Sequence, residues 1–123
     1  MPQITLEMSD NVLENELTEL LIAIHHTLSE QLPTELRSCK SRMIRHQTYV
    51  IGDADQHNAF VHLSIGVIKG RSDALKNAIA ASLMEKLKMT FAQSLKQLDC
   101  QITIAISDLP DVYLKLAHPA LPE

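Results

Sequence analysis

A chain of 123 residues has the length of one ordinary domain, and 46% of these residues are hydrophobic, so the chain can bury a core. Its formal net charge is −4 and its pI is near 5.8, which argues against the basic surface of a nucleic-acid-binding protein. No apolar run approaches the ~20 residues of a membrane span, and no basic segment followed by an apolar one opens the chain, so we expect a cytoplasmic protein without a signal peptide.

The N-terminus is predicted to form a strand, because Ile4, Leu6 and Met8 alternate with polar residues. Proline is tolerated at the first position of a strand, which is a sufficient structural reason for Pro2. A chemical alternative is that removal of Met1 leaves Pro2 with a free secondary amine. Burial lowers the pKa of a terminal amine below its ordinary ~7.7 to 8, so that a buried amine is a base near neutral pH.

A long amphipathic helix is predicted next. Asn11 and Glu14 resemble a capping box at its start, and Pro33 lies where it should stop. Leucine and isoleucine recur at spacings of three and four on one face, at positions 13, 17, 20, 21, 24, 28 and 32. His25 and His26 lie late in this helix, and we interpret them as surface residues that complement the helix dipole.

An extended segment is predicted over residues 37–51, followed by a turn-rich break at 52–55. Alternation places Lys40, Arg42 and Ile44 on one face of this segment. Cys39 and Cys100 have no metal-type spacing, and we expect two free thiols.

The second half repeats the pattern of the first. A strand is predicted over residues 59–68, and Ser72 is the expected N-cap of a helix that runs to Leu98. Alternating isoleucines at 102, 104 and 106 predict a last strand, and the tail from Pro110 is expected to be irregular.

The order strand, helix, strand occurs twice, which predicts one α+β domain built of two pseudo-repeats, at about 2–51 and 58–108, plus a C-terminal tail. Two right-handed β-α-β units side by side form a four-stranded mixed sheet with both helices on one face. Phe60 and Ile44 then fall on the helix-free face, which needs a cover. Oligomerisation is the simplest cover, so we predict more than one chain per particle.

Several motifs together resemble the tautomerase superfamily. They are the start Pro2-Gln3-Ile4-Thr5-Leu6-Glu7-Met8-Ser9-Asp10-Asn11, the pair Ser41-Arg42, the strand Ala59-Phe60-Val61-His62-Leu63 and the turn Gly70-Arg71-Ser72. Within the superfamily the sequence is most similar to the 5-carboxymethyl-2-hydroxymuconate Δ-isomerases of homoprotocatechuate breakdown. The similarity runs from Pro2 to about Asp108 and weakens over the tail.

This resemblance implies a homotrimer that uses Pro2 as acid and base on a carboxylated dienol, without cofactor or metal. Arg71 and Arg42 would hold substrate carboxylates. Lys40 stands where close relatives carry an arginine, and a lysine keeps the charge but loses the planar bidentate fork. The mechanism requires loss of Met1, because with Met1 attached the nitrogen of Pro2 is an amide.

Two alternatives remain open from the sequence. In the first alternative, the chain is a tautomerase of another enol or oxo-acid, an interpretation motivated by Lys40 and the divergent tail. In the second, it is a non-catalytic oligomeric binding protein of the same fold, in which the three cations are solvated residues of a strand and a turn.

Overall fold

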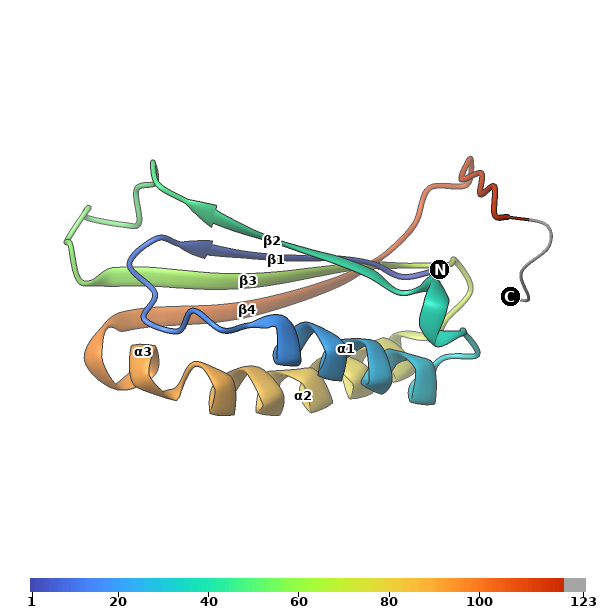
Figure 1. The fold of residues 1–123 in the computed structure, drawn as a ribbon, viewed down its shortest axis with the longest axis horizontal. Helices are drawn as coiled ribbons and strands as arrows, with labels where there is room; N and C mark the ends of the chain where they lie inside the picture. The colour runs from blue at the N-terminus through green and yellow to red at the C-terminus, as the bar shows by residue number, and fades with distance from the viewer. Residues whose placement is uncertain (119–123) are drawn as a thin grey trace.

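Four strands form one mixed sheet, and both long helices cover the same face of it (Figure 1). The computed structural model describes residues 1–118. The strands are β1 (Gln3–Ser9), β2 (Lys40–His46), β3 (Asn58–Val67) and β4 (Asp99–Asp108), in the spatial order β2-β1-β3-β4. The helices are α1 (Thr18–Gln31), the short 3-10 helix η1 (Leu36–Ser38), α2 (Asp73–Thr90) and α3 (Ala92–Gln97).

Two parallel strand pairs meet at an antiparallel junction in the middle of the sheet. β1 pairs in parallel with β2, β3 pairs in parallel with β4, and the central strands β1 and β3 run antiparallel. Helical segments connect the strands of each parallel pair, as such connections require. The predicted α+β architecture is confirmed, whereas the division into pseudo-repeats at 2–51 and 58–108 stays a prediction.

The hydrophobic core lies between the sheet and the helices. Alternate residues of β1 and β3 face the helices and are buried, while the residues between them are partly exposed on the other face. The fully or almost fully buried strand residues are Ile4, Leu6, Met8, Ala59, Val61, Leu63, Ile65 and Val67. Leucines and isoleucines of α1 and α2 close this core, and none of the described helices is long and apolar enough to cross a membrane.

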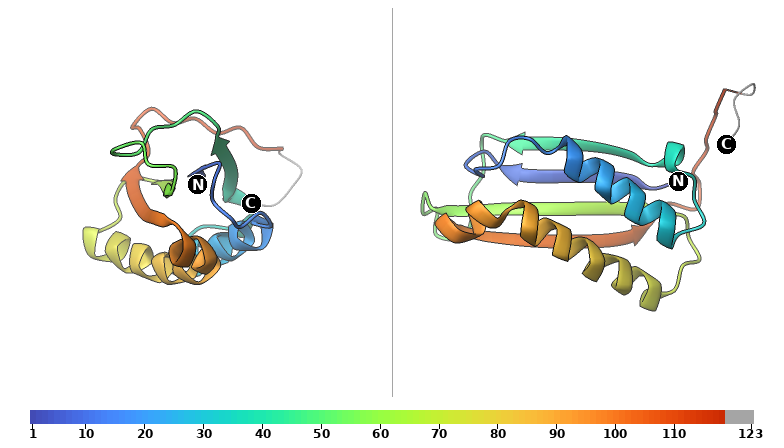
Figure 2. Two further views of the ribbon diagram at one scale, coloured as in Figure 1. Left: turned by 90° about the vertical axis from the view of Figure 1, so that its left-hand side faces the viewer. Right: turned by 60° about the horizontal axis from the view of Figure 1, so that its bottom comes forward.

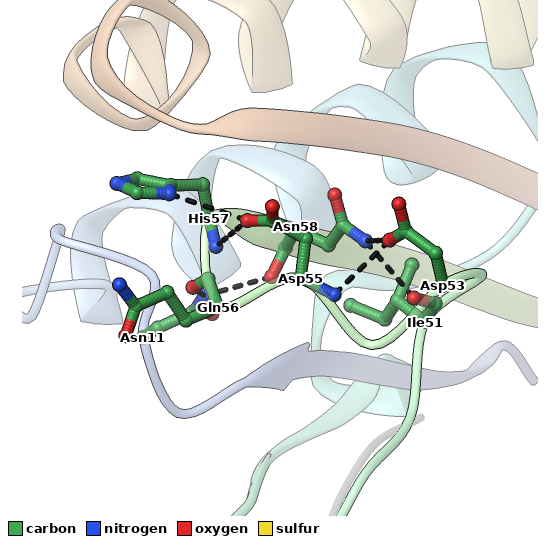
Figure 3. Close-up of polar contacts among 7 residues, drawn as sticks. All are labelled: Asn11, Ile51, Asp53, Asp55, Gln56, His57 and Asn58. Atoms are coloured by element: carbon green, nitrogen blue, oxygen red, sulfur yellow. Dashed lines mark hydrogen bonds and ion pairs between the residues drawn. The ribbon is translucent and has the colours of Figure 1, made fainter.

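The start of α1 differs from the prediction. The helix begins at Thr18, and no side chain caps it. Asn11 instead donates to two carbonyls where the β2–β3 loop ends (Figure 3). The carboxylate of Glu14 accepts hydrogen bonds at the start of α3, among them one from the Ser94 hydroxyl at 2.5 Å. The predicted capping box is therefore wrong, because both of its side chains bind groups that are distant in the sequence.

The second helical region is also divided. The continuous helix predicted up to Leu98 ends at Thr90, and α3 starts after Phe91, whose side chain is fully buried in the core. The predicted N-cap of α2 is confirmed, since the hydroxyl of Ser72 accepts a hydrogen bond from the N–H of Leu75 at 3.1 Å.

The segment predicted to be extended over 37–51 is shorter as a strand. Its beginning forms η1 and its end forms part of the β2–β3 loop (Figure 3). The carboxylate of Asp53 accepts the side-chain N–H of Asn58 at 2.9 Å, and that of Asp55 accepts the backbone N–H of His57 at 2.8 Å. These bonds fix the predicted turn, in which Gly52 adopts φ +53°.

Candidate active site

The N-terminus lies at the end of the sheet where η1, the turn before α2 and the C-terminal segment (residues 109–118) come together (Figure 2). Pro2 is buried, and its carbonyl accepts the N–H of Lys40 at 3.2 Å. The chain start is thus held as an extension of β1 against β2, which gives Pro2 a fixed place.

A cavity of about 520 Å³ opens at this end of the sheet. Pockets for small molecules in proteins measure ~300 to 1,000 Å³, so its volume suits such a ligand. It is lined by Met1, Pro33, Thr34, Glu35, Ser38, Ile68, Arg71, Lys115 and Ala117. A second hollow of about 270 Å³ shares Met1 and Ile68 with this cavity.

Positive side chains surround the terminal amine. Burial lowers the pKa of the Met1 amine below its ordinary 8.0, and the nearby Cys39 thiol opposes this shift. Lys115, Arg71 and Lys40 each lower the same pKa further, because a neighbouring cation disfavours a second positive charge. The environment at the start of β1 therefore favours a neutral amine.

Arg71 reaches the cavity from the turn between β3 and α2. Gly70 adopts φ +112° there, a backbone conformation that residues with a side chain rarely adopt. Ser72 caps the helix that follows. The Nε of Arg71 is buried, and no described group accepts a hydrogen bond from it. A buried donor without an acceptor is costly, so this guanidinium is suited to an anion in the cavity.

The other two predicted cations occupy different places. Lys40 opens β2, opposite Gln3, and its Nζ donates to the carbonyl of Ser38 at 3.3 Å. Arg42 lies further along β2, where its guanidinium bonds to the side-chain oxygen of Gln3 at 2.7 Å and is 3.4 Å from the carbonyl of Ile4. Of the three predicted cations, the structure places Arg71 in the cavity lining, whereas Lys40 and Arg42 lie outside it, on β2 beside the N-terminus.

Several residues near the amine escaped the sequence analysis. Lys115 lines the cavity from the C-terminal segment, and the hydroxyl of Tyr113 accepts a hydrogen bond from Gln3 at 2.9 Å. Cys39 is a free, buried thiol whose pKa is raised by burial, and Cys100 is also free, as predicted. The sequence carries no local signal for Lys115 and Tyr113, because they lie in the tail that was predicted to be irregular and that forms no helix or strand up to residue 118.

No group of three or more histidine, cysteine or acidic side chains within residues 1–118 has a geometry that suits a metal ion. Our expectation of an activity without metal or cofactor stays a prediction.

Comparison with protein families gives a match over residues 2–118 to the family described as 5-carboxymethyl-2-hydroxymuconate isomerase. A search of curated proteins gives no match. Among solved structures, the chain is similar to a 5-carboxymethyl-2-hydroxymuconate isomerase from Deinococcus radiodurans R1, with 27% identity and a TM-score of 0.87 over 95% of this chain and 90% of that one.

Two further structures show the same fold at lower identity. One is a 5-carboxymethyl-2-hydroxymuconate delta-isomerase, with 19% identity and a TM-score of 0.67 over 96% of this chain and 89% of that one. The other is a fused 4-OT protein described as a symmetric trimer, with 15% identity and a TM-score of 0.67 over 94% of this chain and 91% of that one.

Proposed function

This chain belongs to the 5-carboxymethyl-2-hydroxymuconate isomerase family and is a tautomerase-type isomerase, and from this premise we propose that it moves a proton within a carboxylated dienol by means of the Pro2 amine. The observation that carries the proposal is the buried start of β1 beside a cavity with two cationic side chains. A cytoplasmic role in the breakdown of aromatic compounds is part of the proposal.

The proposed reaction needs one base and no net change in atoms. The neutral amine of Pro2 takes the proton from the enol oxygen, and the electrons of that O–H bond form the ketone. The double bonds shift by one position, and the protonated amine returns the proton to the carbon at the end of the dienol that is distant from this oxygen. The product is a conjugated ketone, and the amine is neutral again.

Arg71 and Lys40 have two roles in this proposal. They attract the carboxylates of the substrate, and they stabilise the negative charge that develops on the oxygen as its proton leaves. We expect them also to keep the Pro2 amine neutral between turnovers, by the same repulsion that lowers the pKa of the Met1 amine. Arg42 is proposed to hold another carboxylate from the sheet side, next to Gln3.

Removal of Met1 is a requirement of the proposal. With Met1 attached, the nitrogen of Pro2 is an amide and has no basic lone pair. Met1 also lines both the larger cavity and the smaller hollow, so its loss would enlarge the space next to Pro2.

A homotrimer is the proposed assembly. The helix-free face carries Phe60 and Ile44, and Ile44 is 42% exposed, so a single chain leaves apolar surface on this face uncovered. The fused 4-OT protein of the same fold is described as a symmetric trimer. Light scattering that gives a mass of one chain would remove this part of the proposal.

The role of Pro2 is tested with a Pro2→Ala variant from which Met1 is still removed, verified by intact mass. Its primary amine lacks the ring of proline, and we expect turnover of 5-carboxymethyl-2-hydroxymuconate to fall by about 100-fold or more, within the range of general acid–base catalysis. Near-normal turnover would refute the role of Pro2.

A second candidate function is tautomerisation of a different enol. Two observations favour it: a lysine at position 40, and an Arg42 that lies outside the cavity lining. A panel of enols and oxo-acids with one, two and three carboxylates separates the two candidates. Absence of turnover on the whole panel, with Met1 removed, would favour the non-catalytic binding protein.

A further inference from the structure

The C-terminal segment brings Tyr113 to the start of β1. The N–H of Leu109 donates to the carbonyl of Val67, the last residue of β3, at 2.7 Å, and the side chain of Leu109 lies over Gly66. Gly66 belongs to the helix-free face of the sheet, so the segment runs over that face and reaches Gln3 at the beginning of β1. The segment and the N-terminus lie side by side at this end of the sheet (Figure 2).

Two consecutive hydrogen bonds decide which groups donate and which accept at Tyr113. A guanidinium only donates, so the side-chain oxygen of Gln3 is the acceptor of its 2.7 Å bond with Arg42. The amide nitrogen of Gln3 is therefore the group that faces Tyr113, and it donates to the phenol oxygen at 2.9 Å. Within residues 1–118, the hydroxyl of Tyr113 makes this hydrogen bond alone, and it makes it as an acceptor. Its own O–H is consequently available to donate to a ligand.

Tyr113 lines the smaller hollow, of about 270 Å³. Ile68 and Leu109 are among the apolar residues of this lining. Its two charged side chains, those of Lys69 and Asp111, pair with each other at 3.0 Å. Sites for small molecules combine apolar walls with a few placed polar groups, and the phenol O–H is such a group here.

The smaller hollow adjoins the place of the proposed proton transfer. Met1 and Ile68 line both this hollow and the larger cavity, which Arg71 also lines. A ligand that extends from one into the other therefore has its middle at the start of the chain, where Pro2 is the first residue once Met1 is removed. A carboxylate is favoured beside the guanidinium, whereas a neutral donor between apolar walls suits an oxygen that is charged only during the reaction.

We propose that the hydroxyl of Tyr113 donates a hydrogen bond to the substrate oxygen that loses its proton to Pro2. Gln3, which Arg42 orients, is the positioning residue that holds this hydroxyl. The inference rests on the proposed function and deepens it by naming a further catalytic residue.

The proposed bond involves no second proton transfer. The enol proton goes to the Pro2 amine, while the O–H bond of Tyr113 stays intact and is directed at the oxygen that becomes negative. A donor aimed at developing charge stabilises the transition state more than the bound substrate. A hydroxyl that already accepts a hydrogen bond from a polarised amide is also a stronger donor.

The kinetic test compares Tyr113→Phe with the matched control Tyr49→Phe, in protein that lacks Met1. Tyr49 is also partly buried, but it lies beyond β2, and its ring packs against that of Phe60 with the centroids 6.5 Å apart. The substrate is 5-carboxymethyl-2-hydroxymuconate, the tricarboxylate enol of the proposed reaction. In Tyr113→Phe we expect kcat to fall by about 10- to 100-fold and KM to stay within about threefold of the wild-type value, because the lost bond acts mainly in the transition state. Tyr49→Phe should leave both values unchanged, and equal kcat values for the two variants would overturn the inference.

A second variant tests whether Gln3 acts through Tyr113. Gln3→Met removes the two hydrogen bonds of this side chain and keeps its length. We expect it to lower kcat by about 3- to 10-fold in otherwise wild-type protein, and to have no further effect in the Tyr113→Phe background. A purely structural role of Gln3 would lower kcat equally in both backgrounds, and this result would contradict the positioning role.

An experiment without turnover keeps this inference separate from the proposed reaction. The chain contains two tyrosines, so NMR of protein labelled with 13C at tyrosine Cζ gives two resonances, which the phenylalanine variants assign. The probe is oxalate, a planar anion that resembles the enolate of a 2-oxo acid and cannot be protonated at carbon. We expect oxalate to move the Tyr113 resonance toward the position of a phenolate, because donation to an anion draws the proton away from the phenol oxygen.

The Tyr49 resonance is the internal control and should stay in place. A Tyr113 resonance that does not move throughout the oxalate titration would overturn the inference. A moved Tyr113 resonance in a protein that isomerises no enol would contradict only the proposed reaction.

Discussion

The two ends of the sheet both gather charged and polar side chains, but the partners of these side chains differ. In the β2–β3 loop, the carboxylates of Asp53 and Asp55 accept hydrogen bonds from groups of the same loop (Figure 3). At the N-terminal end, Arg71 and Lys115 line a cavity, and the buried Nε of Arg71 has no acceptor among the described residues.

This contrast separates a structural use of polar residues from a ligand-binding one. Groups that satisfy one another fix a backbone conformation and need nothing else. A buried donor at a cavity that no described group accepts from, such as the Nε of Arg71, gains from an anion placed there. The account therefore predicts that changes at the N-terminal end alter activity, whereas changes at the loop end and at the helix contacts alter stability.

The largest expected effect is that of Arg71→Ala. We expect kcat/KM for the tricarboxylate enol to fall by about 100-fold or more, because a donor to the developing negative charge is lost. The melting temperature should not fall, since the variant removes a buried donor without an acceptor. Steady-state kinetics and thermal unfolding measure the two quantities. A kcat/KM within threefold of the wild-type value would contradict the expectation that changes at the N-terminal end alter activity.

Glu14→Ala should lower stability and leave activity unchanged, the opposite of Arg71→Ala. The carboxylate accepts the backbone N–H groups of Gln93 and Ser94 at 3.0 and 3.1 Å, and the buried hydroxyl of Ser94 as well. We expect the free energy of unfolding, from urea titration, to fall by about 2 to 3 kcal/mol, with kcat per folded molecule unchanged. The exposed Glu16→Ala is the control, expected within about 0.5 kcal/mol of wild type. Equal stability of the two variants would show that the hydrogen bonds of Glu14 do not stabilise the fold.

Gly66→Ala tests whether the C-terminal segment belongs to the active end. Its Cβ would meet the terminal Cδ2 of Leu109 at 2.7 Å, so this side chain must move. We expect a cost of about 1 kcal/mol or less in unfolding free energy, and a severalfold rise in KM for the tricarboxylate if the segment moves with the side chain. The double variant Gly66→Ala/Leu109→Ala should recover the KM, and failure to recover it would argue against steric displacement of the segment.

A smaller effect is expected for Asp53→Ala at the loop end. Hydrogen bonds to its carboxylate, first that from the backbone of Asp55, lower the pKa of Asp53 below its ordinary value. The stabilisation is therefore present above the unfolded pKa of ~3.9 and is lost as the pH falls through the folded pKa. Thermal scans should show a lower melting temperature for the variant at pH 7 and a smaller difference from wild type below about pH 4, with unchanged kcat/KM throughout. A difference that grows toward low pH would contradict this sign.

The smallest expected effect is a displacement of the pH profile of activity. Lys115 lowers the pKa of the Met1 amine, and we expect the same repulsion to act on the Pro2 amine once Met1 is removed, so Lys115→Met should raise the pKa of Pro2. The acidic limb of kcat/KM, which reports the free enzyme, then moves to higher pH, while in the control Lys96→Met, on α3, it stays in place. A shift to lower pH in Lys115→Met would show that its charge does not act on the amine.

The sequence was sufficient to predict the strands of the sheet and the residues of the core, because both follow from local periodicity. Alternation identified β1 and β3, and the spacing of leucines identified the helical regions that cover them. The start of α1 was mispredicted, because Glu14 bonds to Ser94, a residue 80 positions away, and no local pattern contains such a partner. Phe91 interrupts the second helical region for a similar reason, since its fully buried side chain depends on tertiary packing.

The candidate site was only partly accessible from the sequence. The free amine of Pro2 was one chemical interpretation of the sequence itself. The roles of Arg71, Arg42 and Lys40 came from the resemblance to a family, because spacing alone does not distinguish substrate-binding cations from solvated ones. Lys115 was missed, since its approach to the cavity depends on the path of the C-terminal segment over Gly66. That path is set by contacts between distant parts of the chain, which period and composition do not encode.

The most direct test of the central claim is a titration of the Pro2 nitrogen itself, by NMR of processed protein labelled with 15N-proline. The account predicts a free secondary amine with a pKa below the ~8 of an ordinary terminal amine, coincident with the acidic limb of kcat/KM. A nitrogen that stays blocked by Met1 in the active protein, or a pKa well above 8, would contradict it.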